Sequence, residues 1–165
     1  MTTITRHDIE IEISGNLPPV GTNAPSFSLA ATDLADVSLN DFIGKKVLLN
    51  IFPSIDTPTC AKSVRAFNEQ AASMDNTIVL CISPDLPYAH KRFCEVENID
   101  NVVALSTFRN PEFGRDYGVT MISTQRRGLL ARAVVVIDGK GKVIYTELVP
   151  ELTQEPDYQA ALRSL

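Results

Sequence analysis

The sequence has no excess of basic charge and no long hydrophobic run. Its 165 residues include 15 Lys and Arg against 20 Asp and Glu, which gives a net charge of -5. A nucleic-acid-binding protein needs a basic face to neutralise phosphates, so we expect no nucleic acid as a partner. No apolar run approaches the roughly 18 residues of a membrane span, and the first residues lack the basic-then-apolar order of a signal sequence. We therefore expect a cytoplasmic protein with no membrane partner.

Histidine and cysteine are also scarce. The chain has two histidines, His7 and His90, and three cysteines, Cys60, Cys81 and Cys94. They form no cluster at the spacing of zinc ligands, and glycine-rich phosphate loops are absent, so we expect neither a metal nor another cofactor. An odd number of cysteines in a chain without a signal sequence does not describe a secreted disulfide framework. In a reducing compartment this favours a catalytic or redox role for cysteine.

The shortage of histidine also limits the possible reactions. Cysteine hydrolases rely on a histidine general base, and only His7 and His90 are available. His90 precedes Cys94 by four residues on one face of a predicted helix. At that spacing it could lower the pKa of the Cys94 thiol or form half of a metal site. We expect instead a solvent-exposed histidine on the helix surface.

The length and the 44% hydrophobic content fit one globular domain over residues 1–165, with residues 1–20 as an N-terminal hairpin extension. Residues 9–13 alternate between apolar and charged side chains, and Ile4 lies in the other arm of the hairpin. Strands that alternate with helices, followed by a closing hairpin, predict an α/β domain with a mixed sheet. The predicted strands are 26–30, 47–52, 78–83, 101–105, 132–137 and 143–149, and the predicted helices are 58–74, 86–97, 112–117 and 156–165.

Cys60 is the candidate nucleophile because of its place between a strand and a helix. If Thr57 is the N-cap, Pro58 takes the first helical position and Cys60 lies in the first turn. The free backbone N–H groups and the positive end of the helix dipole favour an anion there, and a thiolate is the reactive form of cysteine. The alternative is that Cys60 is not reactive and serves as a small apolar residue that packs the helix against the sheet.

The other two cysteines have different settings. Cys94 lies 34 residues after Cys60, which excludes a Cys-x-x-Cys pair. A separation of 34 residues allows a disulfide only if both helices lie on the same side of the sheet and the two Cα atoms can approach to about 5.5–6 Å. An unpaired thiol on a helix surface is the alternative for Cys94. Cys81 lies within an apolar run typical of a central strand, so we expect it to be buried and inert.

Arg132 interrupts an apolar strand, where an unpaired charge would be costly to bury, so its guanidinium must meet an anion. The residues alone leave two candidates for that anion: the Cys60 thiolate, or a carboxylate such as Asp56 or Glu69. The Thr57 hydroxyl is open to two interpretations as well. It could cap the helix, or it could donate to the thiolate and accept from a substrate.

Together these residues form the pattern Pro53-x-x-x-Thr57-x-x-Cys60 with Arg132 far downstream, which resembles the active-site signature of the peroxiredoxins. Within that family the chain resembles the bacterial thiol peroxidases, and the resemblance covers essentially the whole sequence. The stretches that carry it are 50–57, 63–68, 106–110, 131–138 and 155–162.

The resemblance implies a thioredoxin-like fold with a central mixed sheet flanked by helices, an N-terminal β-hairpin and a homodimer. It implies that Cys60 reduces hydrogen peroxide or an organic hydroperoxide and that Cys94 resolves the product as an intrasubunit Cys60–Cys94 disulfide, which thioredoxin reduces. Pro53 would shield the sulfur, Thr57 and the Cys60 N–H would orient the peroxide, and Arg132 would stabilise the thiolate and the charge on both oxygens. Cys81 matches a non-catalytic cysteine of some relatives.

Three segments depart from the subfamily pattern. Pro58-Thr59 stands where Gly-Val is common, and residues 95–98 are more acidic than usual and lack glycine. The loop 121–128, which carries Arg126 and Arg127, is short for the family and is expected to shape access for bulky substrates.

Two other functions compete with a peroxidase. A redox sensor or chaperone-like binding protein would use the same disulfide to signal to a partner, and would consume peroxide slowly. A disulfide oxidoreductase would share the fold but needs its two cysteines close in sequence, which the surroundings of Cys60 do not provide.

Overall fold

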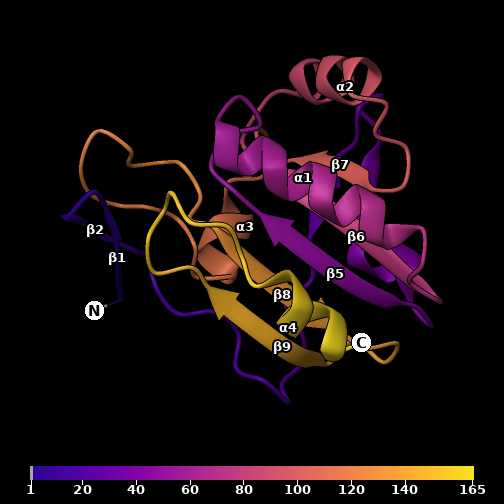
Figure 1. Ribbon diagram of the computed structural model, residues 1–165. Helices are drawn as coiled ribbons and strands as arrows, with labels where there is room; N and C mark the ends of the chain where they lie inside the picture. Colours follow the sequence, from indigo (N-terminus) through magenta and orange to yellow (C-terminus); the bar gives the residue numbers. More distant parts are fainter. Residues whose placement is uncertain (1) are drawn as a thin grey trace.

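The computed structural model describes residues 2–165 and contains a seven-stranded sheet in the order β4-β3-β7-β6-β5-β8-β9 (Figure 1). Strands β5, β6 and β7 run parallel, whereas the remaining neighbours pair antiparallel, so the predicted mixed sheet is confirmed. The strands of this sheet are β3 (Ser28–Ala30), β4 (Asp36–Ser38), β5 (Lys46–Ile51), β6 (Thr77–Ser83), β7 (Val103–Ser106), β8 (Ala133–Ile137) and β9 (Val143–Leu148). The helices are α1 (Pro58–Ala71), α2 (Pro87–Val96), α3 (Glu112–Asp116) and α4 (Tyr158–Arg163).

Alternation along the central strands creates two hydrophobic cores, one on each face of the sheet. Leu49 of β5 and Val135 of β8 belong to the core that α3 and the N-terminal hairpin cover. Leu48 and Val134, each one residue away, belong to the opposite core with residues of α1, α2 and α4. Because Arg132 is two residues before Val134, this alternation sends its side chain toward the face that α1 covers.

The predicted N-terminal hairpin is confirmed as a separate two-stranded sheet of β1 (Thr3–Arg6) and β2 (Ile9–Glu12), in which Ile4 pairs with Ile11. His7 and Asp8 form its turn with φ values of 49° and 68°, the positive angles that a two-residue hairpin turn requires. Both paired isoleucines are buried in the core on the α3 side. The hairpin is therefore packed against the sheet.

Several boundaries differ from the prediction. Strand β4 and the short 3-10 helix Leu39–Phe42 were not predicted, because elements of three and four residues leave no periodic pattern in the sequence. Helix α4 begins two residues later than expected, since the Asp157 side chain accepts a hydrogen bond from the Ala160 N–H at 3.0 Å and so acts as its N-cap.

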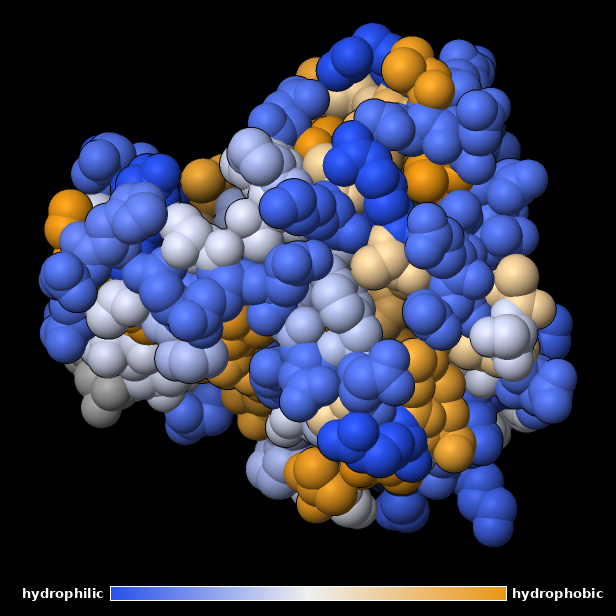
Figure 2. Space-filling view, viewed as in Figure 1, coloured by the Kyte–Doolittle hydropathy of each residue, from blue (hydrophilic) through white to orange (hydrophobic). Residues whose placement is uncertain are grey.

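The surface of the molecule is mostly polar. Figure 2 shows the face over α1 and α4 as largely hydrophilic, with apolar side chains in separate patches. Within residues 2–165, no helix is long and apolar enough to cross a membrane.

Gly118 fixes the contact between the N-terminal segment and the turn after α3. Its φ is 67°, and an added Cβ would overlap the backbone of Asn16. We expect Gly118→Ala to lower the free energy of unfolding by about 2–4 kcal/mol, from the left-handed backbone together with the overlap. Gly21→Ala is the control, because Gly21 has a φ of 92° with no atom within 4 Å of an added Cβ. It should lose only about 1–2 kcal/mol in urea denaturation, and an equal loss in both variants would contradict the overlap.

Candidate active site

The start of helix α1 places Cys60 as the sequence predicts. Thr57 is the N-cap and Pro58 the first helical residue, and the Cys60 N–H donates to the Thr57 hydroxyl at 3.4 Å. The same hydroxyl donates to the Ser54 carbonyl at 3.1 Å. Capping is therefore the observed role of Thr57. Any other group that accepts a hydrogen bond from this hydroxyl has to displace the Ser54 carbonyl.

Arg132 contacts the sulfur rather than a carboxylate. Its Nη1 lies 3.3 Å from Cys60 Sγ, while Nε and Nη2 donate to the Leu152 carbonyl at 3.2 and 2.9 Å. Arg132 is only 2% exposed, so its guanidinium is buried. The three hydrogen bonds hold it in one orientation. Asp56, one of the carboxylates considered from the sequence, pairs with Arg92 at 3.4 Å instead. Helix dipole and guanidinium thus both favour negative charge on the Cys60 sulfur.

A pocket of about 230 Å³ opens over this contact. Pro53, Thr57 and Arg132, which the sequence analysis singled out, all line it, while Cys60 itself is fully buried beneath them. In Figure 1 the start of α1, the segment that leads to α4, the loop before β8 and the N-terminal hairpin converge at this end of the sheet. The remaining lining residues are Arg6, Ser54, Pro58, Thr59, Arg126, Leu129, Leu152 and Thr153.

Cys94 lies on α2, on the same side of the sheet as Cys60. It is partly buried and packs against the core that contains Cys60 and Phe93, so this condition for a disulfide is met. All three cysteines are free in the structure. Burial, with a contribution from the Glu95 carboxylate, raises the pKa of the Cys94 thiol. In the folded protein Cys94 is therefore a neutral thiol and a poor nucleophile at neutral pH.

Cys81 is buried in the central strand β6, as predicted. Burial raises the pKa of its thiol to about 12, although a hydrogen bond from the Asn50 side chain at 3.7 Å acts in the opposite direction. A thiol in this state is neutral and shielded from solvent, so the structure agrees with an inert role.

His90 corrects the prediction of an exposed histidine. It is 1% exposed, and its Nε2 lies 2.8 Å from the Ser83 hydroxyl. The buried face of α2 consists of Pro87, His90 and Phe93, at a spacing of three residues, while the apolar Val96 is 72% exposed. The polarity of the side chains therefore predicted the wrong face of α2 as the buried one.

Residues 2–165 contain no group of three or more His, Cys, Asp or Glu that could hold a metal ion.

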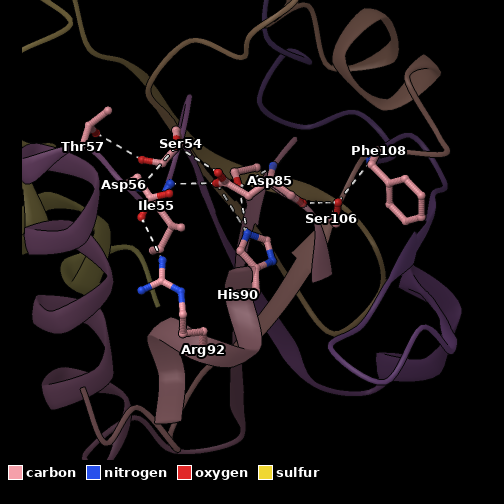
Figure 3. A network of polar contacts seen from close by, with 10 residues as sticks. Ser54, Ile55, Asp56, Thr57, Asp85, His90, Arg92, Ser106 and Phe108 are labelled. Carbon is pink, nitrogen blue, oxygen red and sulfur yellow. Dashed lines mark hydrogen bonds and ion pairs between the residues drawn. The ribbon is translucent and has the colours of Figure 1, made fainter. Parts of the chain in front are cut away.

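Asp85 connects the loop before α1 with the start of α2, a role that no local pattern in the sequence indicates. Its carboxylate accepts hydrogen bonds from the Ile55 N–H at 2.7 Å and the Ser54 hydroxyl at 2.9 Å (Figure 3). On the other side it bonds the Ser83 hydroxyl and lies 3.7 Å from His90 Nε2. Leu86 is the N-cap of α2 and makes no side-chain capping bond. The residue next to it instead holds the loop that carries Pro53 and Thr57.

These hydrogen bonds also determine the charge of Asp85. Burial alone would raise the pKa of its carboxyl group, but the nearby His90 ring and the hydrogen bonds from Ser83, Ile55 and Ser54 outweigh burial and lower the pKa to about 2. The carboxylate is therefore charged whenever the loop is held in place at physiological pH.

Known proteins resemble the chain over almost its whole length. The Redoxin family description matches residues 19–162, which excludes the hairpin. A thiol peroxidase from Corynebacterium glutamicum is 55% identical over 156 residues, which are 94% of each chain. A thiol peroxidase from Mycobacterium tuberculosis is 55% identical over 165 residues, or 100% of this chain and 99% of the relative. The crystal structure of a peroxiredoxin-like protein from Aquifex aeolicus is 37% identical with a TM-score of 0.93, covering 99% of this chain and 95% of the other.

The charge of Asp85 should make the stability of the protein depend on pH. Since the pKa of about 2 lies below the ordinary value of about 3.9, the carboxylate stabilises the folded state fully above pH 4, and this contribution is lost as the pH falls from about 4 to about 2. We expect Asp85→Asn to cost about 1–2 kcal/mol in urea denaturation at pH 7, and the difference from the wild type to shrink at pH 3.

Asp56→Asn is the matched control, because Asp56 lies in the same loop but pairs only at the exposed surface with Arg92. It should change the stability by less than about 0.5 kcal/mol at either pH. A cost of Asp85→Asn that is equal at pH 7 and pH 3 would show that the charge of Asp85 does not hold the loop.

Proposed function

The chain belongs to the Redoxin family and is a thiol-dependent peroxidase, and from this premise we propose that Cys60 is the sulfur that reacts with the hydroperoxide. The relatives and the solved structure confirm the thioredoxin-like fold and the family resemblance predicted from the sequence. The observation that carries the proposal is the contact between Arg132 Nη1 and Cys60 Sγ at 3.3 Å, beneath a pocket that Pro53 and Thr57 also line.

In the proposed first step the Cys60 thiolate attacks the terminal oxygen of the hydroperoxide. The S–O bond forms as the O–O bond breaks, and the other oxygen leaves with the electron pair and takes a proton to become water or an alcohol. Cys60 becomes a sulfenic acid. The fixed guanidinium of Arg132 faces the charge that moves from sulfur to oxygen, so it stabilises the transition state without having to reorganise. Pro53 is buried against the site and limits the access of water.

The second step requires both helices to open locally. Cys60 is fully buried in the first turn of α1, and Cys94 is half-buried on α2 with a raised pKa. Once exposed, the Cys94 sulfur attacks the sulfenic sulfur, the S–S bond forms, and the hydroxyl group leaves as water after it takes up the thiol proton. The buried fold protects the thiolate, and its local opening completes the cycle.

A thioredoxin-type dithiol then reduces the Cys60–Cys94 disulfide by thiol–disulfide exchange and returns both thiols. Such a reductant works in a reducing compartment, which supports the cytoplasm as the location.

We also propose a homodimer. The groove of about 580 Å³ near Pro84 supports it, because the apolar side chains of Phe108 and Ile122 are 43% and 46% exposed there.

The two cysteines should differ sharply when each is replaced. We expect Cys60→Ser to abolish hydroperoxide consumption. Cys94→Ser should consume one equivalent per subunit and then stop with thioredoxin as the reductant, because the sulfenic acid has no partner. Cys81→Ser is the control and should keep multiple turnover. The measurement is the number of equivalents consumed, and sustained thioredoxin-driven turnover in Cys94→Ser would refute the resolving role.

Replacement of Arg132 should slow the first step specifically. We expect Arg132→Ala to lower the second-order rate constant of Cys60 oxidation by about 10²-fold, since a fixed donor to the developing charge is lost. Arg132→Lys should recover part of the rate, because it keeps the charge but not the geometry of the guanidinium. Single-turnover consumption of hydrogen peroxide measures this constant. A rate in Arg132→Ala within about twofold of the wild type would contradict the assigned role.

A further inference from the structure

The pocket over Cys60 is cationic in a protein that is acidic as a whole. Arg6 from β1 and Arg126 from the loop before β8 line it together with Arg132, and no Asp or Glu is among its lining residues. The whole chain has a net charge of -5. Arg132 is bound to the sulfur and to the Leu152 carbonyl, so it accounts for only one of the three positive charges.

The guanidinium groups of Arg6 and Arg126 have no partner among residues 2–165. Within residues 2–165, arginines pair with carboxylates in Arg65–Glu97, Arg92–Asp56 and Arg109–Asp36. Within these described residues, the side chains of Arg6 and Arg126 form neither an ion pair nor a hydrogen bond. Both are partly buried at the pocket, where a charge is less screened by water than on the open surface.

The loop backbone fixes Arg126 beside the pocket. Its N–H donates to the Thr124 hydroxyl at 3.2 Å, and its carbonyl accepts from the Leu129 N–H at 3.1 Å. The neighbouring Arg127 is exposed, and its Nη1 donates to the Thr124 carbonyl at 2.9 Å, so it does not line the pocket. The two adjacent arginines therefore have different environments, and only Arg126 is available to a molecule in the pocket.

The rest of the lining is suited to an organic molecule. Leu129 and Leu152 contribute apolar side chains, and Pro53 and Pro58 contribute rigid rings. The pocket thus combines a reactive end at Cys60, an apolar wall and two unpaired cations. Hydrogen peroxide has neither an apolar body nor an anionic group, so its reduction uses only the first of these features.

We propose that this pocket selects organic hydroperoxides that carry a carboxylate, with Arg6 and Arg126 as the residues that recognise the anion. The peroxy group reacts at Cys60, the hydrocarbon part packs against Leu129 and Leu152, and the carboxylate pairs with the two guanidinium groups. This inference rests on the proposed reaction of Cys60 and adds the charge of the preferred substrate. The bonds that form and break are those of the proposed first step.

The test compares cumene hydroperoxide with its para-carboxylate, two substrates that differ by one negative charge at neutral pH. The second-order rate constant for each is measured by single-turnover loss of hydroperoxide without thioredoxin, so that a docking partner cannot contribute. For the wild type we expect the carboxylate to react about tenfold faster at low ionic strength, and the ratio of the two constants to fall as salt is added.

The arginine variants assign the preference to residues. Arg126→Gln and Arg6→Gln should each lower the ratio of the carboxylate constant to the neutral constant, and the double variant should bring it close to one. Arg126→Lys should retain part of the ratio, because it keeps the charge. Arg127→Gln is the matched control, which removes one positive charge from the same loop and should leave the ratio unchanged.

The outcomes separate this inference from the function on which it depends. Equal rate constants for the two hydroperoxides in the wild type would overturn the anion preference while leaving Cys60 as the reacting sulfur. A ratio that falls equally in Arg127→Gln and Arg126→Gln would overturn it too, since the preference would then reflect overall charge. If neither hydroperoxide oxidises Cys60, the proposed reaction itself fails.

Discussion

The contact between the Arg132 guanidinium and the Cys60 sulfur is the interaction on which the rest of the site depends. A buried guanidinium is costly unless it finds acceptors, and here the sulfur and the Leu152 carbonyl accept from Nη1, Nε and Nη2. Two elements far apart in sequence therefore have to meet: the first turn of α1, and the residue just before β8. The central sheet brings them together because β5, which leads to α1, pairs directly with β8.

The site must be both rigid and able to open. Closed, it fixes the sulfur, the Thr57 cap and the guanidinium, which is the arrangement that electrostatic catalysis needs. Yet Cys60 has no exposed surface, and Cys94 is a neutral thiol while it is folded into α2. Asp85 lies between the two regions, since it accepts hydrogen bonds from the loop before α1 and from the Ser83 hydroxyl, which in turn contacts the histidine of α2. Opening at one cysteine therefore weakens the same network that holds the other.

Much of this could be predicted from the sequence, and the failures have physical reasons. The Thr57 cap, Cys60 in the first turn, the buried Cys81 and the N-terminal hairpin follow from local patterns and are confirmed. The partner of Arg132 stayed open, because the strand pattern shows that a buried cation needs an anion but not which one lies opposite. His90 was placed on the wrong face of α2, since its burial depends on Ser83 and Asp85 across a turn. Asp85 was missed because its bonds to Ser54 and Ile55 span 31 and 30 residues of sequence.

The central claim is that Cys60 and Cys94 form a disulfide within one chain after a hydroperoxide has reacted. The most direct measurement is a non-reducing peptide map of the wild-type protein after one equivalent of hydrogen peroxide per subunit. We expect one new linked pair of peptides, which contain Cys60 and Cys94, with Cys81 still a free thiol and no covalent dimer. A link from Cys60 to Cys81, a disulfide between two chains, or no link at all would contradict the account.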